Sequence, residues 1–108
     1  MEIHWDNYIW EKLYSSIRSL IGPGNQRERL LNACINSLTF AEGKVFPDKR
    51  SEKMFGDIME KLKVGEPKAD EGLIAASINE LNDLEVNRAI EDILSLYDHV
   101  TRHMNPIV

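Results

Sequence analysis

Three clusters of glycine and proline divide the chain into segments and restrict what each segment can form. They lie at residues 22–24, 43–47 and 65–67, and these two residue types are the strongest local interruptions of regular structure. In every segment between them the apolar residues recur three and four positions apart. That is the period of an α-helix and not the alternation of a β-strand. The sequence therefore predicts an all-α fold.

A further break is expected in the long last segment, near Asn82. Asn82 and Glu85 have the spacing of a capping box, in which two side chains accept hydrogen bonds from the free backbone N–H groups at a helix start. Asn25 and Glu28 show the same spacing at the start of the second segment, and Gly43 can end that segment in a left-handed conformation. The expected helices are residues 6–21, 25–42, 48–64, 70–81 and 83–103.

The apolar stripes of these helices are expected to share one core. A chain of 108 residues favours a single domain over residues 1–108, because independent domains mostly contain about 50–200 residues. We therefore expect a single compact bundle of about five helices. The stripe residues, in helix order, are Trp10, Leu13, Ile17 and Leu20; Leu31, Cys34, Ile35 and Leu38; Phe55, Ile58, Met59 and Leu62; Leu73, Ile74, Ile78 and Leu81; and Val86, Ile90, Ile93, Tyr97, Val100 and Met104.

Negative charge is concentrated in the last two-fifths of the chain. The formal net charge is −5, and residues 64–108 carry nine acidic and three basic side chains, whereas residues 1–63 carry nine acidic and ten basic ones. An acidic segment repels phosphate groups, so we expect no nucleic-acid binding there. A basic protein partner fits the charge better.

The chain shows no sign of a membrane span or of an oxidising compartment. Its longest apolar run is residues 73–76, whereas a span needs about 20 residues. Its one cysteine, Cys34, has no partner for an internal disulfide. The start of the chain carries no secretory pattern, so we expect a cytoplasmic protein.

No catalytic residue and no cofactor are predicted. Cys34 lies on an apolar stripe, where a cysteine usually acts as a small core residue. The paired carboxylates fall between stripe positions, where water is expected to surround them, and acid–base catalysis needs an enclosed carboxyl group. These pairs are Asp70–Glu71, Glu80–Asp83 and Glu91–Asp92.

His99 and His103 are four residues apart and can face one metal ion from one side of a helix. Val100 stands where the zinc-protease motif places a catalytic glutamate, so that chemistry is excluded. Asp98 lies about 100° around the helix from His99, and His4 becomes a third ligand only if the chain ends meet. We expect the two histidines mainly to complement the negative end of the helix dipole, and no metal site is predicted.

Three stretches resemble small all-helical proteins of bacteria: residues 24–30, the Phe46–Pro47 pair before a helix, and residues 93–97. The resemblance covers scattered positions through most of the chain. It implies a bacterial, cytoplasmic setting, and it implies no activity.

These observations favour a non-enzymatic protein-interaction or regulatory module. We expect it to dock a basic partner through the acidic face of the last two helices, or through an aromatic anchor at Trp5, which lies close to Tyr8 and Trp10 in the sequence. The acidic residues concerned are Glu80, Asp83, Glu91, Asp92 and Asp98. Two alternatives stay open: a structural homo-oligomer, such as a homodimer, built on the last helix, and a small metal-dependent enzyme that uses His99 and His103.

Overall fold

The computed structural model describes residues 8–62 and 72–103, which form helices and no strand. The α-helices are α1 (Tyr8–Leu20), α2 (Gln26–Asn36), α3 (Lys49–Lys61), α4 (Gly72–Glu80) and α5 (Asp83–Arg102), and η1 (Leu38–Ala41) is a short 3₁₀ helix. The prediction of an all-α bundle of about five helices is confirmed.

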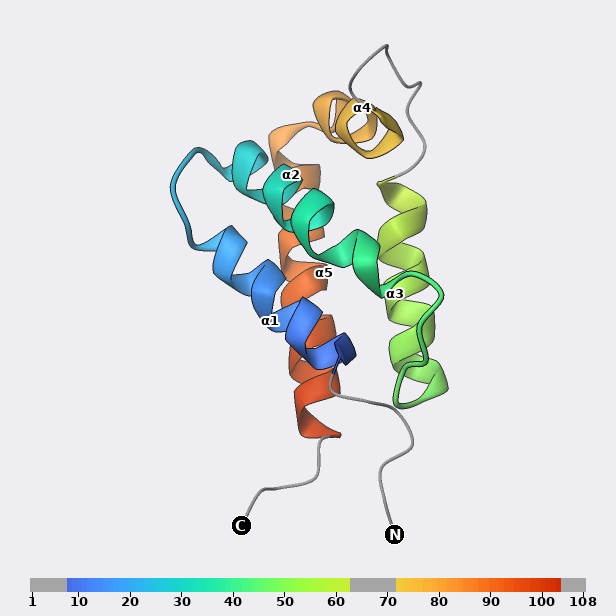
Figure 1. The fold of residues 1–108 in the computed structure, drawn as a ribbon. Coiled ribbons are helices and arrows are strands. Elements are labelled where there is room, and N and C mark those ends of the chain that lie inside the picture. The colour runs from blue at the N-terminus through green and yellow to red at the C-terminus, as the bar shows by residue number, and fades with distance from the viewer. Residues whose placement is uncertain (1–7, 63–71, 104–108) are drawn as a thin grey trace, which may run out of the picture.

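The long helix α5 organises the bundle (Figure 1). It contacts α1, α2 and α3, whereas α4 packs against α2 at one end of the molecule. The N-terminal end of α1 lies near the C-terminal end of α5, because the Trp10 ring nitrogen Nε1 donates a hydrogen bond to Thr101 Oγ1 at 2.9 Å. The two helices therefore run antiparallel.

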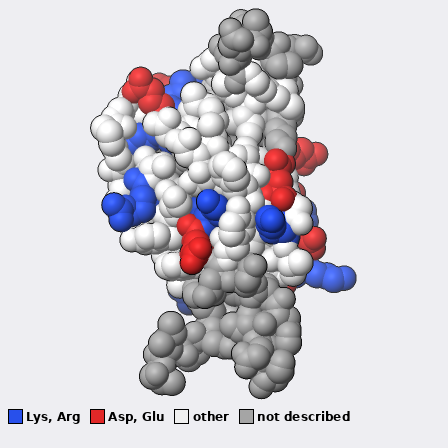
Figure 2. Space-filling view, in the orientation of Figure 1, with Lys and Arg blue, Asp and Glu red and all other residues white. Residues whose placement is uncertain are grey.

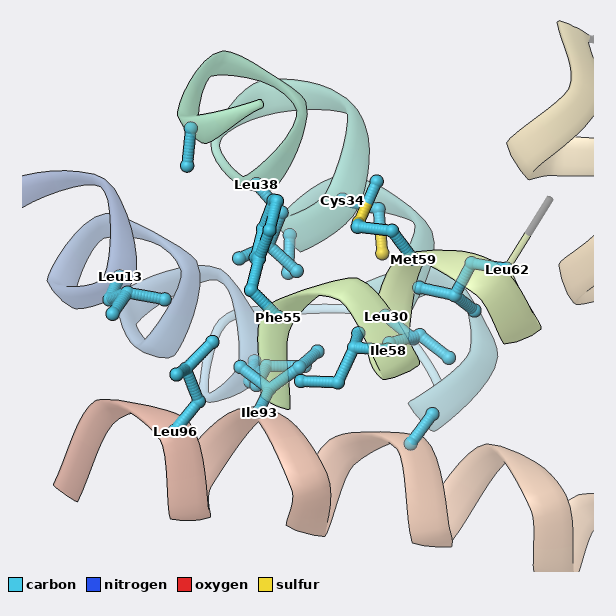
Figure 3. Close-up of a cluster of buried hydrophobic side chains, with 14 of the residues drawn as sticks. Leu13, Leu30, Cys34, Leu38, Phe55, Ile58, Met59, Leu62, Ile93 and Leu96 are labelled. Atoms are coloured by element: carbon cyan, nitrogen blue, oxygen red, sulfur yellow. The ribbon is translucent and has the colours of Figure 1, made fainter. Parts of the chain in front are cut away.

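The core is built from apolar side chains of every helix that packs on α5. Figure 3 shows Leu13, Leu30 and Leu38 converging with side chains from α3 on the inner face of α5. The α3 stripe of Phe55, Ile58, Met59 and Leu62 is buried as expected. On α5 the fully enclosed face consists of Val86, Ala89, Ile93, Leu96 and Val100.

Both predicted capping boxes are present. The Asn25 side chain accepts from the backbone N–H of Glu28, and the Glu28 carboxylate accepts from that of Asn25, both at 2.8 Å. Asn82 and Glu85 repeat the arrangement at 2.8 and 2.9 Å. Residues 72–102 therefore form two helices, with the break at the position that the sequence indicated.

The prediction of one continuous helix over residues 25–42 is wrong. The α-helix ends at Asn36, Ser37 has φ −138° and ψ −59°, and the chain continues as η1. Ser37 and Thr39 are poor helix formers, and 3₁₀ turns are frequent at helix ends. The break keeps Leu38 fully buried.

Some stripe residues lie nearer the surface than the periodicity suggested. The buried face of α2 is Leu30, Ala33 and Cys34, so Ile35 is 46% exposed. The core-facing residues of α2 therefore lie one position earlier in the sequence than the stripe that was predicted for a helix over residues 25–42. Other expected core residues are only partly buried: Trp10, Ile17, Leu31, Leu73, Ile74, Leu81, Ile90 and Tyr97. Met104 lies outside the described residues.

Arg27 fixes the position of the turn between α4 and α5. Its Nη1 donates to the carbonyl oxygen of Ile78 in the last turn of α4, and its Nη2 pairs with Asp83 Oδ1 at 3.1 Å. Carbonyl groups in the last turn of a helix lack helical partners. One guanidinium therefore joins the start of α2 to the end of α4 and the start of α5.

The substitution Arg27→Gln is expected to lower the free energy of unfolding by about 1–2 kcal/mol, because it removes the charged hydrogen bond to the Ile78 carbonyl oxygen. The ion pair with Asp83 contributes little, because the Asp83 side chain is fully exposed. Urea titration followed by circular dichroism measures this change. Arg18→Gln is the matched control, since Arg18 is exposed on α1 and forms no ion pair with the described residues. Equal effects of the two substitutions would show that Arg27 holds nothing in place.

Candidate functional site

The structure brings Asp48, His99 and His103 together at one end of the bundle. Asp48 is the N-cap residue of α3, His99 lies in the last turn of α5, and His103 is the C-cap residue of α5. Asp48 Oδ2 is 2.9 Å from His99 Nε2 and 3.0 Å from His103 Nε2. One carboxylate oxygen therefore faces two imidazole nitrogens.

The other carboxylate oxygen of Asp48 is held by the start of α3. Oδ1 accepts from the backbone N–H of Ser51 at 2.8 Å and from the Ser51 hydroxyl at 2.7 Å. These are the bonds of an N-cap residue, which satisfies a free N–H in the first turn. They fix the carboxylate so that Oδ2 faces both histidines, while Oδ1 also lies 3.2 Å from His99 Nε2.

The protonation of His103 follows from its two neighbours. Its Nδ1 lies 2.9 Å from the carbonyl oxygen of His99, and a carbonyl oxygen only accepts, so Nδ1 carries a proton. In a neutral ring Nε2 then presents a lone pair to Asp48 Oδ2. Either a second proton on the ring or a metal ion between the two atoms removes this repulsion.

The surroundings of Asp48 favour its charged form. Burial alone would raise the pKa of its carboxyl group, but the hydrogen bonds from Ser51 and His99 outweigh burial and hold the pKa well below the usual aspartate range. The cluster is open on one side, because the His103 side chain is 42% exposed and that of His99 is 19% exposed. The His103 ring is therefore partly in contact with solvent.

Two of the three residues of this cluster, His99 and His103, were identified from the sequence. The spacing of His99 and His103 correctly placed both rings on one side of a helix, 4.4 Å apart between ring centroids. Asp98 points elsewhere and pairs with Arg102, as its angle around the helix indicated. His4 lies outside the described residues. Asp48 was missed because it is 51 residues from His99, and the sequence identified it only as the expected start of the helix over residues 48–64.

Three of the predicted acidic residues pair with basic side chains. Asp83 pairs with Arg27, Asp92 with Lys61 at 3.6 Å, and Asp98 with Arg102 at 2.9 Å. Glu80 is exposed on α4 and Glu91 on α5. On the face over α1, α2 and α3, side chains of both signs are also mixed (Figure 2).

An aromatic cluster joins α1 to α5. The rings of Trp10 and Tyr14 are stacked 5.2 Å apart, and the Tyr97 ring lies 6.0 and 6.5 Å from them. Trp5, the predicted aromatic anchor, lies outside the described residues. The sequence drew attention to Trp10, but it assigned Tyr97 to the core and gave no sign that Tyr14 joins the cluster.

Cys34 is a core residue, as expected. Its side chain is fully buried, and burial raises the pKa of its thiol to about 12. A nucleophilic cysteine needs the opposite shift of the thiol pKa, because the thiolate is the reactive form.

Of the three carboxylate pairs considered in the sequence, Asp70–Glu71 lies outside the described residues.

Comparisons of the chain with protein-family models, with curated protein sequences and with solved structures give no match. None of the helices in the described part of the chain combines the length and apolar character that a membrane span requires.

Two substitutions of Asp48 are expected to distinguish its role as a helix cap from the role of its negative charge. Asp48→Ala removes the acceptor for the Ser51 N–H and should lower the free energy of unfolding by about 1 kcal/mol, whereas Asp48→Asn should keep most of that stability. Chemical denaturation of both variants provides the measurement. Asp57→Ala, which removes only an exposed pair with Lys53, is the control. A loss as large in Asp48→Asn as in Asp48→Ala would refute the cap assignment.

The thiol of Cys34 is expected to react only after unfolding. At pH 8 its modification by an aromatic disulfide reagent should be at least about 100-fold slower in the folded chain than in guanidinium, since burial suppresses the thiolate. Cys34 is the only cysteine, so the absorbance of the released thiolate reports it alone. Comparable rates in the two states would contradict its burial.

Proposed function

We propose that this chain is a non-enzymatic protein-binding module whose docking surface is the seam between α1 and α5. The α1–α5 seam is defined here by Trp10, Tyr14, Leu94 and Tyr97, with Glu91 and Asp98 beside Leu94 on α5. The proposed partner is a protein segment with an apolar side chain next to lysine or arginine. The proposal keeps the expected acidic helix α5 but centres the surface on aromatic side chains.

The observation that carries the proposal is the partial exposure of a rigid aromatic cluster. Tyr14 is 41% exposed although its ring is stacked on Trp10, and Leu94, three residues before Tyr97 on α5, is 44% exposed. The hydrogen bond from Trp10 to Thr101 holds the cluster in place. Aromatic side chains supply much of the binding energy in protein interfaces, and a fixed ring loses little conformational entropy on binding.

Charge beside the seam supports a basic partner. Leu94 lies three residues after Glu91 and four before Asp98, so these side chains are neighbours on the helix surface. Asp98 is partly neutralised by Arg102, but Glu91 forms no ion pair with the described residues. Residues 72–103 carry six acidic and two basic side chains. The resulting negative field would attract a basic segment and make association depend on salt.

Selection of peptides from a displayed random library tests the surface without a known partner. We expect enriched peptides to carry an apolar residue next to Lys or Arg. Leu94→Arg should weaken their binding at least about 10-fold, because it places a charge in the apolar centre. Leu84→Arg is the matched control, since Leu84 is exposed on the same helix, ten residues away.

Peptides without basic residues, or binding that is equally sensitive to Leu94→Arg and Leu84→Arg, would contradict the proposal. Glu91→Lys should weaken binding mainly at low salt, and Glu80→Lys, on α4, should not.

Light scattering of the free protein tests the alternative function, a homo-oligomer built on the last helix. A dimer that Leu94→Arg converts to a monomer would assign the seam to self-association.

A further inference from the structure

We propose that Asp48, His99 and His103 form a binding site for one divalent transition-metal ion, of which Zn²⁺ is the best example. The ligand atoms are Asp48 Oδ2 and the Nε2 atoms of both histidines. The Asp48 side of this site belongs to α3, whereas the α1–α5 seam faces α1, and the site does not rest on the proposed docking function.

The ligand atoms already lie close to the positions that a zinc ion requires. One possible ligand atom from each of the three residues lies within 4.8 Å of the other two, and Oδ2 is 2.9 and 3.0 Å from the two Nε2 atoms. Zinc bonds to nitrogen and oxygen are about 2.0–2.2 Å long, so tetrahedral ligands lie about 3.3 Å apart. Shifts of a few tenths of an ångström between oxygen and nitrogen open the site to an ion.

The residues around the ligands hold them in the orientation that metal binding needs. A histidine ligand usually donates its other ring N–H to an oxygen, which fixes the nitrogen that binds the metal. His103 does so through Nδ1 to the carbonyl oxygen of His99. Ser51 plays the corresponding part for Asp48, because it holds Oδ1 and leaves Oδ2 directed at the histidines.

The donor set selects the class of ion. Two imidazoles and one carboxylate suit Zn²⁺ and its transition-metal neighbours, whereas Ca²⁺ and Mg²⁺ prefer oxygen ligands. The exposed side of His103 leaves a coordination position for water. A bound ion would also tie the start of α3 to the end of α5, since Asp48 and His99 belong to different helices.

The test uses the full chain without an affinity tag. Zn²⁺ is titrated in competition with a chromophoric chelator, and thermal unfolding is followed in parallel. We expect one ion per chain and a rise in Tm of about 10–15 °C when free Zn²⁺ is about 100-fold above Kd. Mg²⁺ and Ca²⁺ at the same concentration should leave Tm unchanged.

Three variants test the ligands: His99→Gln, His103→Gln and Asp48→Asn. Each should weaken Zn²⁺ binding at least about 10-fold, because fewer ligands remain. Asp48→Asn can still act as a helix cap, so its loss of zinc affinity is not a folding defect. Asp98→Asn is the matched control, since Asp98 lies one residue from His99 but pairs with Arg102, and it should bind Zn²⁺ like the wild type.

A measurement on the unmodified chain keeps the proposal testable if a variant misfolds. Long-range ¹H–¹⁵N spectra should show Zn²⁺ shifting the Nε2 resonances of His99 and His103 together, with Nδ1 of His103 still protonated. Lack of binding at about 100 µM free Zn²⁺, or affinity unchanged in all three variants, would overturn the proposal.

Discussion

Burial of one face of α5 is the constraint on which the rest of the structure depends. Val86, Ala89, Ile93, Leu96 and Val100 lie at helical spacing and are almost fully enclosed. Each large apolar side chain that is removed from water contributes about 1.5–3 kcal/mol, so α1, α2 and α3 gain most by packing around this stripe. Because α5 contacts all three, its rotation about its own axis determines which remaining side chains face neighbouring helices and which face solvent.

That rotation accounts for both candidate surfaces. On one side of the buried stripe, Tyr97 meets Trp10 and Tyr14 of α1, and Leu94, three residues before Tyr97, is exposed. Towards α3, His99 reaches the carboxylate that caps that helix. The two surfaces therefore share a scaffold but differ in chemistry. The seam offers aromatic area beside negative charge, and the cluster offers nitrogen and oxygen donors to an ion.

The local features of this fold were predicted correctly from the sequence. Two Asn–Glu capping boxes, the α3 stripe and the break at Asn82 are determined by neighbouring residues, so spacing alone identified them. Prediction from spacing failed where contacts between distant segments determine which side chains are buried or meet. Ile35 is exposed because α2 ends at Asn36 and packs through Leu30 and Ala33, and Asp48 meets His99 only because α3 and α5 pack side by side. Neither arrangement can be predicted from the spacing of residues along the chain.

The central claim is that packing on α5 brings the start of α3 and the end of α5 to one site. Amide hydrogen exchange with and without Zn²⁺ tests it most directly. Without the ion, the amides of Ile93–Val100 should be among the slowest and exchange only by global unfolding. With Zn²⁺, amides in the first turn of α3 and the last turn of α5 should slow together. Slowing confined to α5, or fast local exchange at Ile93 and Leu96, would contradict the claim.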